Sequence, residues 1–84
     1  MEFKKGDYVT LDLSFPNYAV GIHSEKTCKV LCYAFSNSFE LHLEGYSRNF
    51  RKATKKEIEH LKKVLIKNKK MYYKGEIIDM PNEI

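Results

Sequence analysis

The segment RNFRKATKKEIEHLKKVLIKNKK, residues 48–70, decides the fold, because it holds a full set of signals for one helix. Thr54 offers a side-chain oxygen to the free N–H groups of a first turn, and Glu57 can accept a hydrogen bond from the Thr54 N–H, which makes a capping box. The spacing predicts an amphipathic helix over residues 55–69, with Asn68 as its C-cap. Its apolar stripe consists of Ile58, Leu61 and Leu65, with Val64 beside them.

Positive charge is concentrated in the same segment. Residues 48–70 hold ten Lys and Arg against two Glu, a net charge of +8, whereas the rest of the chain holds five Lys and nine acidic residues and sums to −4. A field concentrated in this way favours an acidic or polyanionic partner. Lysine-rich helices are also often simple solvated faces, and both interpretations stay open at this point.

Most of the remaining chain is typical of β-strands. At 84 residues it is near the lower limit for a self-sufficient core, so we predict one domain over residues 1–80 with a frayed tail at 81–84. The fold class is α+β: a small antiparallel β-barrel or a curled sheet of four to five strands, with one α-helix in the C-terminal half. The predicted extended segments are 8–13, 27–35, 39–43, 49–53 and 71–80, with a hairpin between 27–35 and 39–43.

The alternation of side chains predicts which residues face the core. In the first strand these are Val9, Leu11 and Leu13, with Tyr8, Thr10 and Asp12 outward. The second has Cys28, Val30, Cys32 and Ala34 on one face and Leu31, Tyr33 and Phe35 on the other. The third has Phe39, Leu41 and Leu43 inward and Glu40, His42 and Glu44 outward.

Residues 14–26 are predicted to form a long loop, because Pro16, Asn17 and Gly21 interrupt the alternation. Loops of this length in small domains either carry function or fold back on the core. Its aromatic residues, Phe15 and Tyr18, are therefore either a secondary recognition surface or caps on the end of the core.

The reactive side chains do not form a familiar catalytic or metal-binding pattern. Cys28 and Cys32 are four residues apart in a predicted strand, too far for a disulfide, and the three histidines are scattered. We therefore expect no metal site, no cofactor and no enzymatic activity, although an enzyme using His23 with either cysteine remains an alternative. The charged N-terminus and the lack of a long apolar run predict a cytoplasmic protein that does not associate with a membrane.

The segment just before the helix is the best candidate for recognition. Arginine can bind phosphate or carboxylate with two hydrogen bonds, and Tyr46 offers a ring for stacking, whereas Phe50 is expected in the core. The predicted partner-binding residues are Tyr46, Arg48, Arg51, Lys55, Lys56, Lys62, Lys63, Lys67, Lys69 and Lys70.

Three stretches of the sequence carry a resemblance to a known group of proteins. They are Lys5-Gly6-Asp7-Tyr8-Val9-Thr10-Leu11, Leu43-Glu44-Gly45 and Asn49-Phe50-Arg51-Lys52-Ala53-Thr54-Lys55-Lys56-Glu57-Ile58. Together they resemble small phage-encoded proteins with an SH3-like β-barrel, over roughly residues 3–63. The resemblance implies a non-enzymatic accessory protein that acts in the bacterial host cell and inhibits or redirects a host component, an anti-CRISPR protein being one version.

The first functional hypothesis is therefore a binding protein whose basic face meets a host protein or nucleoprotein complex. The second is a module that binds DNA or RNA directly, with lysines along the phosphates and aromatic residues stacked on bases. A homodimer formed through Ile66, which departs from the apolar stripe, is a further prediction.

Overall fold

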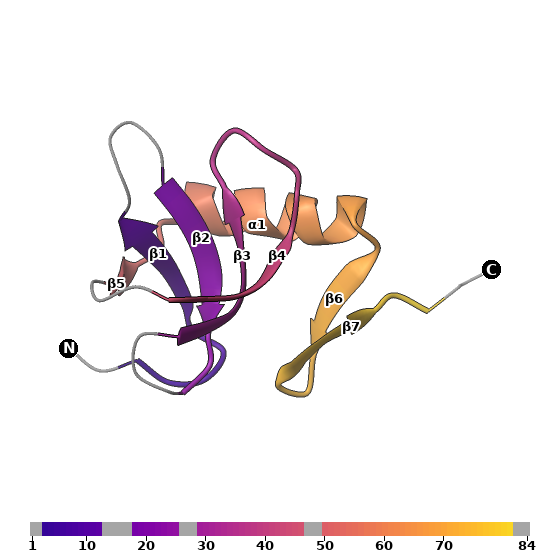
Figure 1. Cartoon of the computed structure of the whole chain (residues 1–84), viewed down its shortest axis with the longest axis horizontal. Helices are drawn as coiled ribbons and strands as arrows, with labels where there is room; N and C mark the ends of the chain where they lie inside the picture. Colours follow the sequence, from indigo (N-terminus) through magenta and orange to yellow (C-terminus); the bar gives the residue numbers. More distant parts are fainter. Residues whose placement is uncertain (1–2, 13–17, 26–28, 47–49, 82–84) are drawn as a thin grey trace.

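The computed structural model describes residues 3–12, 18–25, 29–46 and 50–81. Within them, one helix, α1 (Lys55–Lys67), crosses a face of an antiparallel sheet, and a separate hairpin follows the helix (Figure 1). The sheet contains β1 (Tyr8–Asp12), β2 (Tyr18–His23), β3 (Lys29–Phe35), β4 (His42–Tyr46) and β5 (Phe50–Lys52), in the order β4-β3-β2-β1-β5. The hairpin consists of β6 (Lys70–Tyr73) and β7 (Glu76–Asp79). The predicted α+β class is confirmed.

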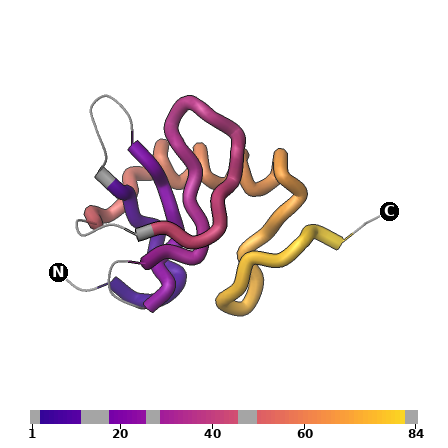
Figure 2. Tube along the Cα trace, in the orientation of Figure 1, coloured from indigo at the N-terminus to yellow at the C-terminus, as the bar shows by residue number. Residues whose placement is uncertain are grey.

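The sheet curls, because a short connection joins its two edge strands. Tyr46 ends β4 and Phe50 begins β5, so their Cα atoms are at most about 15 Å apart at 3.8 Å per residue. Four strand spacings across a flat sheet would separate them by about 19 Å. The two edges are therefore drawn toward each other, which the bent path of the chain in Figure 2 also shows.

Apolar side chains fill both faces of the curled sheet. The helix-side core contains Val20, Ile22, Cys32, Ala34, Ala53, Leu61, Val64 and Leu65. The core on the opposite face contains Val9, Leu11, Ala19 and Val30, with Phe3, Tyr33, Phe35 and Phe50 packed against them. Because both faces bury apolar area, a short chain obtains more hydrophobic stabilisation than a sheet with one wet face would give.

The expected orientation of the first strand is half wrong. Val9 and Leu11 are buried as predicted, but Thr10, expected outward, is fully buried on the helix side. Tyr8 is half-buried against the same helix-side core. The alternation predicts that one face of this strand meets solvent, whereas the helix covers that face.

A β-bulge changes the facing of β3. Ile22 pairs with Cys32 but His23 pairs with Val30, so Leu31 is an extra residue between the two pairs. Val30 consequently lies in the opposite core from Cys32, although strict alternation placed them on one face.

Residues 18–23 form the central strand β2, so the predicted loop over residues 14–26 is wrong there. Gly21 permits the close approach of β3, since a Cβ at this position would lie 2.6 Å from the Cys32 carbonyl oxygen. Tyr18 is half-buried against the helix-side core, with its ring centroid 6.4 Å from that of His60, which fits the interpretation as a cap. Phe15 lies outside the described residues.

The hairpin predicted after β3 is confirmed, but β4 begins and ends three residues later than expected. Gly45 pairs with Val30, and a Cβ on it would lie 2.7 Å from the Tyr33 ring. Phe39 and Leu43, expected to face the core, are 50% and 60% exposed.

The helix begins as predicted and ends two residues earlier, at Lys67. Asn68 is the C-cap, as predicted, and its N–H donates to the Val64 carbonyl oxygen at 3.0 Å. Lys69 has a φ of 57°, and this left-handed conformation ends the helix.

The predicted last strand over residues 71–80 is a two-stranded hairpin. Lys74 and Gly75 have φ values of 47° and 85°, and positive φ at both central residues is typical of a type I′ turn. The hairpin does not extend the main sheet; it packs on the helix-side core through Tyr72 and Ile77.

Candidate binding surface

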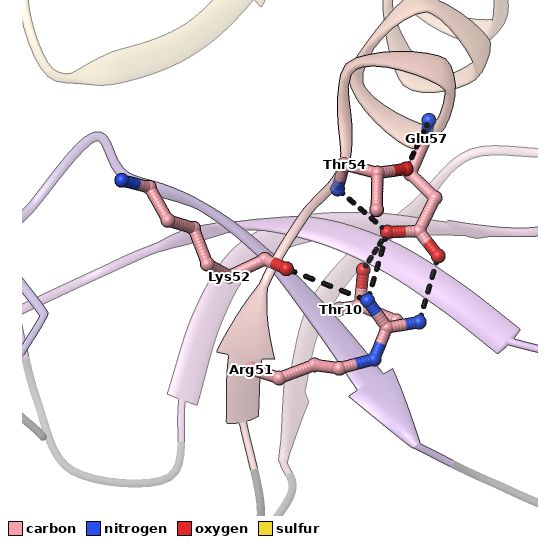
Figure 3. Close-up of polar contacts among 5 residues, drawn as sticks. All are labelled: Thr10, Arg51, Lys52, Thr54 and Glu57. Atoms are coloured by element: carbon pink, nitrogen blue, oxygen red, sulfur yellow. Dashed lines mark hydrogen bonds and ion pairs between the residues drawn. The ribbon is translucent and has the colours of Figure 1, made fainter.

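The start of the helix is fixed to the sheet by one buried carboxylate, that of Glu57 (Figure 3). Its Oε1 accepts hydrogen bonds from the Thr10 hydroxyl at 2.8 Å and from the Thr54 N–H at 2.8 Å. Arg51 donates from both terminal nitrogens, at 3.1 Å to Oε1 and 2.8 Å to Oε2. The Thr54 hydroxyl accepts from the Glu57 N–H at 3.3 Å, so the predicted capping box is present. One side chain thereby joins β1, β5 and α1.

This network determines the charge of Glu57. Burial by itself would raise the pKa of the carboxyl group, but the hydrogen bonds from Arg51, Thr54 and Thr10 outweigh it and lower the pKa to about 2. Glu57 is therefore ionised at neutral pH. Arg51, a predicted partner-binding residue, holds this carboxylate and has a structural role in addition to any role in recognition.

The outer side of the helix carries a surface that we call the lysine face, which is formed by Lys55, Lys56, Lys62, Lys63 and Lys67. All five side chains are exposed, because Glu57, Leu61, Val64 and Leu65 take the directions that point to the sheet. In the described part of the chain, no carboxylate forms an ion pair with any of the five. The lysine face is thus an array of five exposed cations on one helix, which also carries the exposed Glu59 four residues from both Lys55 and Lys63.

Two aromatic rings lie near lysines of the lysine face, that of Tyr8 in β1 and that of Phe39 in the connection between β3 and β4. The Lys62 ammonium lies 5.9 Å from the centroid of the Tyr8 ring, and that of Lys67 lies 5.8 Å from the Phe39 ring. Both distances are within the range of cation–π attraction. Lys62 and Lys67 are exposed to solvent and also lie over aromatic rings.

The other predicted binding residues come from segments outside the helix. Lys69 and Lys70 follow the helix, and the Lys70 ammonium forms an ion pair with Asp79 across the hairpin. Tyr46 belongs to β4, but its side chain and the whole of Arg48 are outside the described residues.

A hollow of about 350 Å³ lies beside the first turns of the helix. Its lining includes Phe3, Asp7, Tyr8, Lys52, Ala53 and Ile58. No local pattern in the sequence predicts this hollow, since the pairing of β1 with β5 brings residues near position 5 next to residues near position 55. In the sequence, only the lysines next to the hollow pointed to a binding surface in this region.

Comparisons with protein-family models, with curated proteins and with solved structures found no match. Within the described residues, no helix has the length and apolar character needed to cross a membrane. The same residues bring no three His, Cys, Asp or Glu side chains into a group that could hold a metal ion.

Proposed function

We propose that this chain is a non-catalytic binding protein of the phage accessory type, which docks its lysine face on an acidic surface of a host protein or nucleoprotein complex and thereby inhibits or redirects it. The lysine face carries the proposal: five exposed cations on one helix have no carboxylate partner among the described residues. Cations held in this way attract a complementary anionic surface and speed its association. An anti-CRISPR inhibitor is one protein of this type.

We infer in addition that the sheet is the SH3-like barrel implied by the sequence resemblance. The support is the strand order, in which β1 lies between β2 and β5, together with the short reach between the two edge strands and the cores on both faces. This arrangement leaves the helix outside the curl, where its lysine face is accessible.

The test is a pull-down of purified components of bacterial immunity complexes, with and without nuclease treatment. The variant Lys56→Glu/Lys63→Glu/Lys67→Glu should lose a partner that the wild type captures. Its matched control is Lys4→Glu/Lys5→Glu/Lys74→Glu, which makes the same charge change at exposed sites away from the lysine face and should retain the partner. Capture of no component, or equal loss in both variants, would refute the proposal.

Direct nucleic-acid binding is the second candidate function, favoured by the length of the lysine face. Positions 55 and 67 are about 18 Å apart along the helix axis, enough to reach several phosphates. Each phosphate contact should contribute about 0.7 to 0.9 to the slope of log K against log salt concentration. A gel-shift titration at two salt concentrations tests this function, and a lack of any shift at low salt eliminates it.

A further inference from the structure

We propose that the hollow beside Tyr8 is a pocket for one aromatic side chain within an acidic segment of the partner protein. This inference rests on the proposed function, since the acidic residues on either side of the aromatic one would meet the lysine face. The hollow would add an apolar contact to the charge attraction of the lysine face, and this contact would distinguish one acidic segment from others.

The walls of the hollow suit a flat apolar group. Phe3 and Tyr8 supply rings, whereas Ala53, just before the helix, and Ile58, within it, supply aliphatic surface. A volume of about 350 Å³ is near the lower end for ligand pockets, so it fits a single large side chain better than a whole ligand. Burial of one aromatic ring in such a site is the kind of contact that dominates binding energy at protein interfaces.

Two lysines border the hollow, one from the sheet and one from the helix. Lys52 lines the hollow at the end of β5, and Lys62 lies over the Tyr8 ring on the helix side. Lys55 precedes Ile58 by three residues and Lys62 follows it by four, so both lie on the same side of the helix as Ile58. Carboxylates on both sides of an inserted aromatic residue would each find a lysine.

A carboxylate in the wall offers an acceptor for the N–H group of a tryptophan ring. Asp7 lines the hollow, and its Oδ2 accepts from the Lys4 N–H at 2.9 Å, which fixes the carboxylate in place. A tryptophan carries no charge and its indole N–H can donate to a carboxylate.

Tryptophan fluorescence provides a selective test, because this protein contains no tryptophan. The probes are two peptides with the same acidic flanks, one with a central tryptophan and one with alanine in its place. We expect the tryptophan peptide to bind about ten- to a hundredfold more tightly, with a blue shift of its emission as the indole leaves water. Competition against one labelled acidic peptide gives both affinities on the same scale.

Variants locate the anchor. Lys62→Glu should reduce the affinity ratio between the two peptides. Lys63 lies about 100° away from Lys62 around the helix, so Lys63→Glu should weaken the binding of both peptides equally. Tyr8→Ala removes a wall but also core packing, so amide chemical shifts of the wild-type protein provide a second measurement. The amides of Tyr8, Ala53 and Ile58 should shift with the tryptophan peptide and not with the alanine peptide.

Each other outcome overturns the inference. Equal affinities without a blue shift would mean that the lysine face binds acidic segments while the hollow takes no anchor, which leaves the proposed function intact. Binding of neither peptide would remove the anchor, and the pull-down would then decide the proposed function separately. Tighter binding of a labelled single-stranded oligonucleotide than of either peptide, with shifts of the Tyr8, Ala53 and Ile58 amides, would assign the hollow to a nucleic acid.

Discussion

Replacement of Glu57 by glutamine should destabilise the fold and also flatten its dependence on pH. Glutamine has nearly the same shape, so the change removes mainly the negative charge that Arg51, Thr54 and Thr10 bind in the folded protein. The glutamine amide would also place an N–H group opposite the N–H groups of Arg51, and two donors cannot form a hydrogen bond with each other.

The size of the effect follows from the pKa of Glu57. A folded-state pKa of about 2 against an ordinary value of 4.5 corresponds to about 3 kcal/mol, at 1.36 kcal/mol per pH unit. The Arg51 side chain is 43% exposed, so water weakens its pairing and we expect about 2 kcal/mol at neutral pH. A domain of 84 residues is stable by about 4 to 12 kcal/mol, so this loss is a large fraction of the total.

The pH dependence has a definite sign. Because the pKa is lower in the folded protein, the contribution of Glu57 is complete above about pH 5 and is lost as the pH falls toward about 2. The difference in unfolding free energy between wild type and Glu57→Gln should therefore shrink over this range. Urea unfolding followed by far-UV circular dichroism at several pH values measures it. Parallel profiles of the two proteins would refute the reasoning.

Three further predictions concern packing and thiol chemistry. Gly21→Ala should destabilise the fold by about 1 to 3 kcal/mol in urea unfolding, since the new methyl group meets a backbone oxygen at 2.6 Å; an unchanged midpoint would contradict this. Leu65→Ala should lower the free energy of unfolding by about 2 to 5 kcal/mol, because Leu65 is buried. Ile66→Ala, at the exposed neighbouring position, should change it by less than about 0.5 kcal/mol, and equal effects would show that the helix packs on the sheet through another side. In a Cys28→Ser background, the Cys32 thiol should resist alkylation until the protein unfolds, because burial raises its pKa to about 12; rapid modification of the folded protein would contradict this.

The helix was predictable because its signals are local. The capping box needs two residues three positions apart, and the apolar stripe repeats within one element, so neither depends on the rest of the chain. Its C-terminal end was harder to place, since the left-handed conformation of Lys69 is one that its residue type does not announce.

The strand β2 could not be predicted, because contacts with distant residues determine it. Gly21 is a turn signal in the sequence, yet in the sheet it makes room for the Cys32 carbonyl oxygen. The facing of Val30 has the same origin, since the bulge in β3 exists only in its pairing with β2. For the candidate site, the lysines were visible as a run of charge, whereas the hollow needed the pairing of β1 with β5.

The lysine face depends on the fold that carries it. A thirteen-residue helix is marginal alone in water, and Lys63 and Lys67, four positions apart, repel each other on its surface. The helix is therefore held by its buried side, where Leu61 and Val64 pack on the sheet and Glu57 binds Arg51. Arg51 comes from the same basic segment as the lysines, so one cation of the segment stabilises the helix on which the other cations are displayed. A substitution that breaks the contacts of the Glu57 carboxylate would destabilise this helix, and the lysine face would then lose its arrangement although no lysine had been replaced.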